Sequence, residues 1–224
     1  WYLANEWSVN LSRGVFYHED NVTGIGQIYV CNGSGSSSRI SVYDMNGSLA
    51  RHITIANTRR IAYDLVLDQN GTIYISEESA VTCLENDGTF KWRTGKNASI
   101  SNYGSTGSGN GEFNYSKGIT IGNDGNLFVA DSQNVRVQVL DKNGSFLRKF
   151  GSSGTAPGQF KNYAYDVESL SDGTLVVRDY SGLNYFDLNG TFIKRLHPPS
   201  GGDLQTGFLA ISKSDEILTY GEKN

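Results

Sequence analysis

The sequence has little proline, methionine or cysteine, with 3, 1 and 2 residues respectively in a chain of 224. Two cysteines exclude zinc-ribbon and iron–sulfur sites built from cysteine clusters. No apolar run approaches the roughly 18 to 20 residues of a transmembrane helix, so no membrane insertion is expected. Basic residues never form runs longer than a pair, and the formal net charge is −4. This balance argues against nucleic acid as a partner, because phosphate binding needs clustered lysine and arginine.

Glycine and aromatic residues, in contrast, are abundant. The chain contains 27 glycines, 13 tyrosines and 10 phenylalanines, and 38% of its residues are apolar against 19% charged. This composition is that of a globular chain rather than a disordered one. Many tight turns combined with many aromatic residues favour an all-β fold.

Four segments of the chain repeat one pattern. They begin at Gly26, Gly71, Gly125 and Gly173, which lie 45, 54 and 48 residues apart. Each contains an alternating apolar run, a turn, a second alternating run, an Asn-Gly or Asp-Gly turn, and a third run. A period in the forties with strand-like alternation is typical of a four-stranded propeller blade.

A further strand is expected before each first glycine, so each unit has four antiparallel strands joined by hairpins. Residues 208–220 resemble the first two strands of a blade, and residues 1–9 resemble the last two. The chain ends are therefore predicted to share one blade, which leaves no free sheet edge. The sequence predicts one domain over 1–224, an all-β, five-bladed β-propeller; a six-bladed ring with one blade outside this chain is the alternative. The blades are predicted at residues 11–57, 58–97, 112–151, 158–197, and 204–224 together with 1–10.

The third repeat carries the most specific motifs. They are Gly111-x-Phe113, Gly118-Ile119, Val129-Ala130-Asp131, Asn134-x-Arg136-x-Gln138-Val139 and Gly144-x-Phe146. With these motifs, residues 111–160 closely resemble an NHL repeat; the fourth repeat fits moderately, and the first two weakly. The resemblance implies a β-propeller, usually of six blades. It leaves function open, because the family includes RNA-binding, protein-interaction and extracellular modules and a related lyase.

Recurring carboxylates are the first candidates for chemistry. Asp131 and Asp179 occupy equivalent positions, and a side chain repeated blade after blade is expected to accept backbone N–H bonds at turns. Asp64 and Asp166 recur in only two repeats, each within Ala-Tyr-Asp, and are expected early in an innermost strand. They are weak candidates for a cation site at the axis, and no other metal site is predicted.

Motifs of familiar catalytic sites are missing from the sequence. The three histidines are not at metal-ligand spacing, and no Gly-x-Ser-x-Gly elbow, phosphate loop or dinucleotide fingerprint occurs in a strand–helix context. We therefore predict no catalytic residue, no cofactor and no enzymatic activity. Cys31 and Cys83 are expected on neighbouring blades, where they form either a cross-blade disulfide or two small buried apolar side chains.

Asparagine glycosylation sequons are unusually frequent. Nine occur, at Asn10, Asn21, Asn32, Asn46, Asn70, Asn97, Asn114, Asn143 and Asn189. Five of them are Asn-Gly-Ser/Thr sequences in expected hairpin turns, where Asn-Gly is favoured because the turn requires positive φ. Turns are exposed, so these sites would be accessible to covalent N-glycans. A secreted, extracellular or cell-surface location is predicted on this basis.

Together these features predict a non-catalytic glycoprotein propeller that acts as a structural or adhesive scaffold. Its partners would be other proteins or copies of itself bound through the propeller faces. Head-to-tail stacking of such discs would give a filament. One alternative is a metal-dependent propeller enzyme of the lyase or lactonase kind, and another is an intracellular protein- or RNA-binding NHL module.

Overall fold

The computed structural model is all-β apart from a single 3-10 turn, η2 (Ser132–Asn134), in the part of the chain that it describes. Among these residues no helix has the length and apolar character to span a membrane. The described residues are 14–19, 23–32, 38–55, 61–99, 101–197, 209–212 and 214–219.

The strands form five sheets, each built from consecutive antiparallel strands. The first contains β1 (Val15–Glu19), β2 (Gly26–Asn32), β3 (Arg39–Asp44) and β4 (Leu49–Thr54). The second contains β5 (Ala62–Leu67), β6 (Ile73–Glu77), β7 (Ala80–Leu84), β8 (Phe90–Ser99) and β9 (Asn102–Ser105). The third contains β10 (Ser116–Ile121), β11 (Leu127–Asp131), β12 (Arg136–Leu140) and β13 (Phe146–Phe150). The fourth contains β14 (Asp166–Ser169), β15 (Leu175–Asp179), β16 (Gly182–Phe186) and β17 (Phe192–Leu196), and the fifth contains β18 (Leu209–Ile211) and β19 (Ile217–Thr219).

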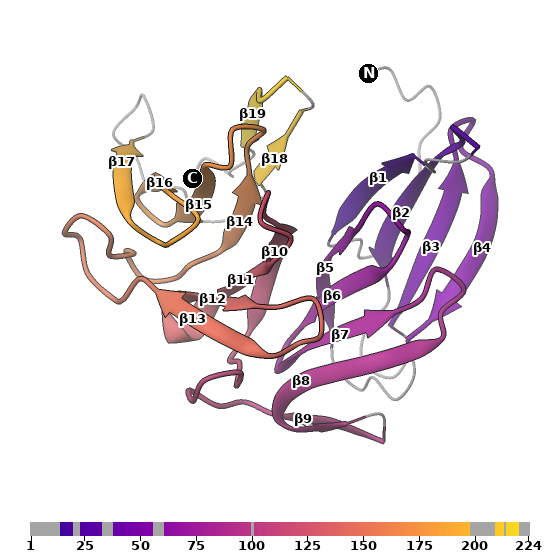
Figure 1. Ribbon diagram of the computed structural model, residues 1–224, viewed down its shortest axis with the longest axis horizontal. Helices are drawn as coiled ribbons and strands as arrows, with labels where there is room; N and C mark the ends of the chain where they lie inside the picture. Colours follow the sequence, from indigo (N-terminus) through magenta and orange to yellow (C-terminus); the bar gives the residue numbers. More distant parts are fainter. Residues whose placement is uncertain are drawn as a thin grey trace, which may run out of the picture.

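The sheets are arranged as blades around a common axis (Figure 1). The first strand of each sheet lies toward the centre, and successive inner strands pack against one another, β1 on β5, β5 on β10, β10 on β14 and β14 on β18. The predicted β-propeller of four-stranded antiparallel blades is confirmed, with a blade count consistent with five. Residues 1–10, predicted to complete the fifth blade, lie outside the described residues.

The second blade differs from the prediction at its outer edge. It was expected to end at residue 97, but β8 runs for ten residues and pairs with a fifth strand, β9. The pairing joins Lys96 to Ser105 and Ser99 to Asn102. The sequence here alternates weakly and is rich in glycine and serine, so periodicity carries no strand signal.

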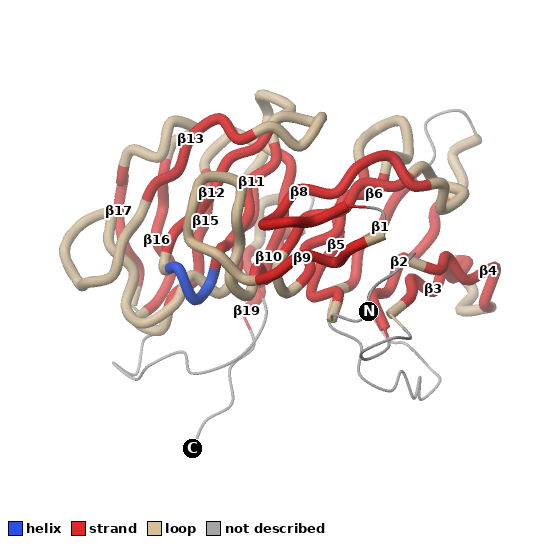
Figure 2. The backbone as a smooth tube through the Cα atoms, turned by 90° about the horizontal axis from the view of Figure 1, so that it is seen from below, coloured by secondary structure: helices blue, strands red, loops and turns tan. Residues whose placement is uncertain are grey.

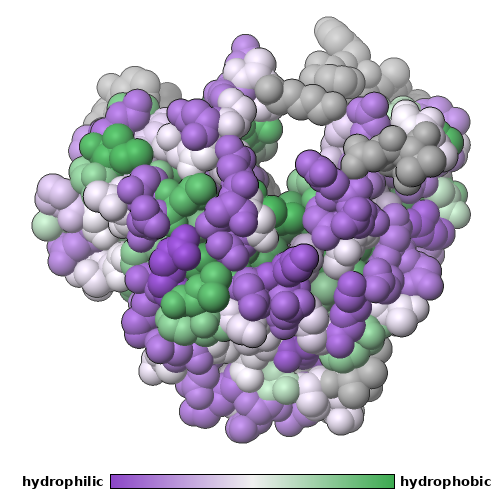
Figure 3. All heavy atoms as spheres, in the orientation of Figure 1, coloured by the Kyte–Doolittle hydropathy of each residue, from purple (hydrophilic) through white to green (hydrophobic). Residues whose placement is uncertain are grey.

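Adjacent blades are held together by apolar clusters. One cluster joins the first and second sheets, and others join the second to the third, the third to the fourth and the fourth to the fifth. The middle strands β6, β7, β11, β12 and β15 are buried along their whole length because a neighbouring blade covers each face. Burial of these faces between blades stabilises the ring. In the view of Figure 3 hydrophilic residues cover much of the visible surface, and hydrophobic residues gather toward the middle.

The two cysteines belong to different clusters. Cys31 packs between the first two blades and Cys83 between the second and third. Both are buried and both are free. Of the two alternatives derived from the sequence, the structure shows two small buried apolar side chains, and the Cys31–Cys83 disulfide is not formed.

Hairpin turns at one end of the blades are stabilised by hydrogen bonds to an aspartate within the same turn. In Asp-x-Asn-Gly-Ser/Thr turns, the aspartate carboxylate accepts the backbone N–H groups two and four residues later. Asp141 Oδ1 accepts those of Asn143 and Ser145 at 2.9 and 2.8 Å, and Gly144 supplies the positive φ of 85°. Asp187 Oδ1 does the same for the next blade.

The antiparallel order gives the disc two different faces. Turns between strands one and two and between strands three and four of a blade lie at one face, here called the hairpin face. It includes the turns at residues 45–48, 68–72, 141–145 and 187–191. Turns between strands two and three, and the links between blades, lie at the other, here called the loop face. Figure 2 shows the disc from the side, with η2 at the loop face.

Candidate binding site

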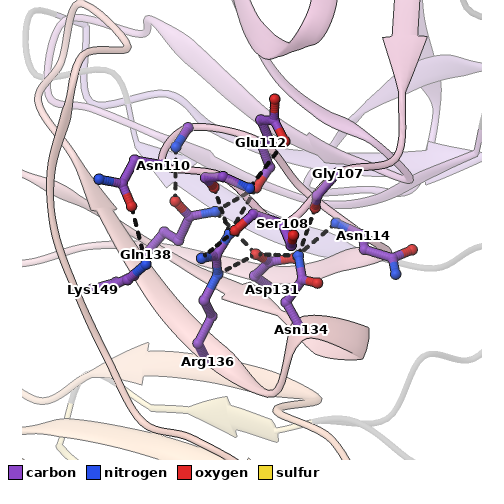
Figure 4. Close-up of polar contacts among 12 residues, drawn as sticks. Gly107, Ser108, Asn110, Glu112, Asn114, Asp131, Asn134, Arg136, Gln138 and Lys149 are labelled. Atoms are coloured by element: carbon purple, nitrogen blue, oxygen red, sulfur yellow. Dashed lines mark hydrogen bonds and ion pairs between the residues drawn. The ribbon is translucent and has the colours of Figure 1, made fainter.

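A buried ion pair organises the loop face of the third blade (Figure 4). Asp131 ends β11, and Arg136 begins β12 after the η2 turn. Arg136 Nε lies 2.7 Å from Asp131 Oδ2, and both side chains are buried. Asn134 and Gln138 also donate to this carboxylate. Burial raises the pKa of Asp131, while the N–H of Asn114, the amide of Asn134 and Arg136 act in the opposite direction.

The same arginine fixes the loop that leads into the blade. Its guanidinium donates to the carbonyls of Ser108, Gly109 and Glu112 at 2.9, 2.7 and 3.0 Å. Gln138 donates to the Glu112 carbonyl at 2.7 Å and accepts the N–H of Gly111 at 2.9 Å. The Asn-x-Arg-x-Gln motif therefore orders a loop through backbone contacts, which is a structural role.

The neighbouring blades repeat this arrangement with variations. Asp179 accepts the backbone N–H groups of Lys161 and Gly182 at 2.8 and 2.9 Å and lies 3.9 Å from Arg195. Glu77 pairs with Arg93 at 3.2 Å, with both side chains buried. The scaffold role predicted for Asp131 and Asp179 from their recurrence is thus what the structure shows.

The inner-strand aspartates link adjacent blades. Asp64 Oδ2 accepts the N–H of Ile119 at 3.1 Å, and Asp166 Oδ2 accepts the N–H of Leu209 at 3.0 Å, each from the following blade. Gly118 faces Asp166 from the preceding blade, where a Cβ atom would overlap the carboxylate. Among the described residues no group of three or more histidine, cysteine or acidic side chains is placed to hold a metal ion. Asp64 and Asp166, the two cation candidates from the sequence, accept backbone N–H groups across the blade interfaces.

The pKa values of the carboxyl groups on the inner strands are raised. Burial raises the pKa of Asp166 to about 6, although Arg178 and Lys117 lower it. Burial, followed by the charge of Asp166, raises the pKa of Asp64 well above its ordinary value. Burial and the charges of the other two raise the pKa of Glu168 in the same way. The inner strands therefore hold an acidic cluster that resists full ionisation.

Above this cluster, at the loop face, lies a pocket of about 300 Å³. It is bounded by the start of β5, the segment leading into β10, η2 and the segment leading into β14. Its lining residues are Tyr63, Tyr115, Lys117, Ser132, Gln133, Tyr163 and Tyr165. Lining by aromatic rings with a few polar groups is the usual composition of ligand sites.

The rings of this tyrosine pocket form two pairs. Tyr63 and Tyr115 have ring centroids 6.3 Å apart, and those of Tyr163 and Tyr165 are 5.4 Å apart. The Lys117 ammonium lies 4.8 Å from the centroid of the Tyr165 ring, and the Arg178 guanidinium carbon lies 5.3 Å from it. Burial raises the pKa of Tyr165, so its hydroxyl stays protonated at neutral pH. The pocket therefore combines aromatic faces, hydroxyl groups and one ammonium group.

Tyr115 is held in a strained backbone conformation. Its φ is 55°, a left-handed value that bulky side chains rarely adopt. Its N–H donates to the Glu78 carbonyl at 2.7 Å, and its carbonyl accepts the Ser132 N–H at 3.2 Å. In the next blade the left-handed residue at the same distance after a buried phenylalanine is Asn162, with φ 66°. Strain at a pocket residue points to a use for the tyrosine ring there.

Tyr115→Asn is therefore expected to leave the fold intact. Asparagine tolerates left-handed φ better than tyrosine, so relief of strain offsets the loss of ring contacts. We expect the free energy of unfolding to stay within about 1 kcal/mol of the wild-type value. Urea denaturation followed by tryptophan fluorescence measures it. A loss of more than about 2 kcal/mol would show that the ring is a core element rather than a pocket wall.

The sequons divide by exposure and by face. Asn46, Asn70, Asn143 and Asn189 are exposed in four of the hairpin-face turns, and Asn97 is exposed in the β8–β9 hairpin at the loop face. Asn32 is partly buried, with its amide donating to Ser41 Oγ at 2.8 Å. Asn114 is partly buried in the link that leads to the pocket, and Ser116 of the same sequon is fully buried. Asn10 and Asn21 lie outside the described residues.

The pocket residues were not predicted from the sequence as a site. They come from four separate segments, and only the ring of blades brings them together. One signal was present, because the repeated Ala-Tyr-Asp places Tyr63 and Tyr165 at equivalent positions next to the inner-strand aspartates. A tyrosine beside each predicted axial residue could have pointed to the central face.

No family model matches the chain. The RING finger protein nhl-1 of Caenorhabditis elegans is 40% identical over 62 residues, which are 28% of this chain and only 6% of that protein. Virginiamycin B lyase from Staphylococcus aureus aligns over 94% of this chain and 69% of its own, with 13% identity and a TM-score of 0.62. A gluconolactonase from Xanthomonas campestris aligns over 87% and 65%, with 14% identity and a TM-score of 0.61.

These similarities establish the β-propeller fold. They also correct one prediction. The absence of a familiar catalytic motif led to the expectation that the protein is not an enzyme, and that expectation was wrong: proteins named as a lyase and a lactonase have this fold. Sequence motifs of helix-containing enzymes are a poor guide here, because a propeller assembles its sites from side chains of several blades.

Proposed function

We propose that the protein is an extracellular, NHL-related glycoprotein propeller that binds a partner at its loop face. The observation that carries this proposal is that the exposed sequon turns and the tyrosine pocket lie on opposite faces of the disc. The exposed Asn-Gly-Ser/Thr turns lie on the hairpin face, whereas the tyrosine pocket opens at the loop face. Glycans on the first face would leave the tyrosine pocket free for binding. Asn97, the one exposed sequon asparagine on the loop face among the described residues, lies in the β8–β9 hairpin and does not line the pocket.

The composition of the pocket supports the binding half of the proposal. Tyrosines offer large, rigid contact areas that are apolar on the ring and polar at the tip, and they are enriched where proteins recognise partners. Tyr163 keeps 39% of its surface exposed, beside the more buried Tyr165. The strained Tyr115 belongs to the same wall.

Self-assembly into a filament would require an accessible hairpin face. Head-to-tail stacking would bury the hairpin face of one disc against the loop face of the next. Glycans at the four turns would then lie inside every contact. A filament of these discs therefore requires a hairpin face free of sugar, whereas a partner-binding disc does not.

Glycopeptide mass spectrometry on native material tests the proposal. We expect sugar on the four hairpin-face asparagines, whose turns are exposed, and none on Asn32 or Asn114, whose sequons are partly buried. Enzymatic removal of glycans should lower the intact mass by the mass of the sugars found on these asparagines. A single unmodified mass, or sugar on Asn114 beside the pocket, would contradict the proposed arrangement of the two faces.

A further inference from the structure

We propose that the tyrosine pocket binds a proline-rich segment of a partner protein in the extended polyproline II conformation. The pyrrolidine rings of the segment would pack on the tyrosine rings, and its backbone carbonyls would accept hydrogen bonds from the polar side chains around them. This inference rests on the proposed function, since it states the chemistry of the partner that the loop face binds. The charges, the rings, the hydrogen-bond donors and the backbone strain at this site each support it.

The charges around the pocket oppose one another, which favours a neutral ligand. Burial, followed by the charge of Asp166, raises the pKa values of Asp64 and Glu168. Lys117 and Arg178 act on the same cluster, because they lower the pKa of Asp166 against the effect of burial. An anionic ligand would therefore meet three carboxyl groups, and a cationic ligand would meet two positive side chains. A neutral segment avoids both costs.

The tyrosine rings suit a chain of pyrrolidine rings. Tyr115 is backed by Tyr63 and Tyr163 by Tyr165, with ring centroids 6.3 and 5.4 Å apart, and Tyr163 keeps 39% of its surface exposed. A polyproline II helix has three residues per turn and is largely formed before binding, and such segments dock in grooves lined by aromatic rings. The pocket volume of about 300 Å³ is at the low end for ligand sites and suits a few residues of chain.

The polar groups of the pocket can donate hydrogen bonds, and a proline-rich segment supplies acceptors. Burial raises the pKa of Tyr165, so its hydroxyl stays protonated, and the Gln133 amide also lines the pocket. Both groups can donate to backbone carbonyls. The carboxyl groups of Asp64 and Asp166 already accept backbone N–H groups of the next blade. Proline has no backbone N–H, so the segment brings carbonyls that need donors and few donors of its own.

The strain at Tyr115 is an independent observation. The chain keeps a tyrosine where the equivalent position of the next blade has Asn162, at a cost in backbone energy. The carbonyl of Glu78 and the N–H of Ser132 hold Tyr115 there. A ring fixed by the backbone loses little conformational freedom when a preformed ligand packs on it, and this lowers the entropic cost of binding.

Nucleic acids and saccharides also pack on aromatic rings, so they are the competing ligands. A nucleic acid requires a run of cations, but the net charge is −4 and Lys117 is the one basic residue among the described residues that line the pocket. A saccharide carries hydroxyl donors that need acceptors, but the carboxyl groups of Asp64 and Asp166 already accept N–H groups from the backbone. The observations therefore favour the proline-rich segment.

Calorimetric titration with an octaproline peptide blocked at both ends, and with a blocked Gly-Ser peptide of the same length, tests the inference. We expect the wild-type protein to bind octaproline at least about tenfold more tightly than the flexible peptide. Tyr115→Asn and Tyr163→Ala should each weaken octaproline binding by about tenfold. Tyr17→Ala is the matched control, because Tyr17 is 41% exposed but does not line the pocket, and it should leave the affinity unchanged.

The dependence on salt separates a neutral ligand from a charged one. Because salt screens only charged groups, raising sodium chloride from about 0.05 M to about 0.5 M should change the affinity for octaproline by less than about twofold. Equal affinity for the two peptides, no binding of octaproline by the wild-type protein, or the same weakening in Tyr17→Ala as in Tyr163→Ala would each overturn the inference.

Displacement of octaproline by an RNA oligonucleotide would instead assign the pocket to nucleic acid, and displacement by the neutral disaccharide galactobiose would assign it to a saccharide. None of these results alters glycan occupancy on the hairpin face, which is measured separately and decides the proposed function.

Discussion

Replacing Arg136 with methionine is expected to lower the free energy of unfolding by about 3 to 5 kcal/mol. Arg136 neutralises Asp131, a carboxylate with no exposed side-chain surface, at 2.7 Å. It also satisfies three carbonyls of the preceding loop. Removing the guanidinium leaves the buried Asp131 carboxylate without its counter-ion, which is the costly case for an ion pair.

Two further variants separate this explanation from a general effect of losing a cation. Lys91 pairs with Glu85 at 2.9 Å, but 40% and 48% of the two side chains remain exposed. Lys91→Met should therefore lower the free energy of unfolding far less than Arg136→Met does, because solvent screens the pair. The double variant Asp131→Asn, Arg136→Met should recover part of the loss. Urea denaturation of all three measures the differences, and equal losses for Arg136→Met and Lys91→Met would contradict the role assigned to the buried pair.

The second large effect is a loss of stability as the pH rises. The pKa of Asp166 is about 6 in the folded protein, against an ordinary value of 3.8. An acid whose pKa is raised by folding contributes its full stability below the unfolded pKa and loses it as the pH passes the folded pKa. Ionisation of Asp166 should therefore destabilise the fold by roughly 3 kcal/mol between about pH 4 and pH 7.

The neighbouring carboxyls reinforce this direction. The pKa values of Asp64 and Glu168 are raised as well, so their ionisation is also unfavourable to folding. Turn carboxylates such as Asp172 and Asp187 act oppositely, because backbone N–H groups lower their pKa values, but Asp172 is exposed and Asp187 is partly exposed. The free energy of unfolding is therefore expected to decrease as the pH rises over this range.

Asp166→Asn isolates the contribution of this one group. Asparagine resembles the protonated acid, so the variant should match the wild-type protein near pH 4 and exceed its stability near neutral pH. Unfolding free energies measured in urea across this pH range test the expectation. A wild-type stability that rises with pH, with the same slope in the variant, would contradict the assigned titration.

The parts of the fold that sequence analysis predicted well depend on local interactions. Asp141 and Asp187 cap their own hairpins, so a few adjacent residues determine the turns. The Asn134, Arg136 and Gln138 motif acts on the loop just before the blade, and its structural use agrees with the blade position predicted for it. Alternation with a period in the forties was enough to predict the strand order.

The parts that were missed depend on contacts between blades. Asp64 was placed correctly on an inner strand, but its bond to Ile119 joins residues 55 positions apart and depends on how two blades pack. The four tyrosines share no sequence spacing that indicates a pocket. Nor does any local pattern show that Asn114 lies near the pocket and is partly buried while Asn143 is exposed.

Site-by-site glycan occupancy on native material tests the central claim most directly, because it reports on the two faces separately. The account predicts sugar on Asn46, Asn70, Asn143 and Asn189 of the hairpin face and none on Asn114 beside the pocket. Sugar on Asn114, or unmodified asparagines in all four of those hairpin-face turns, would contradict the assignment of the two faces.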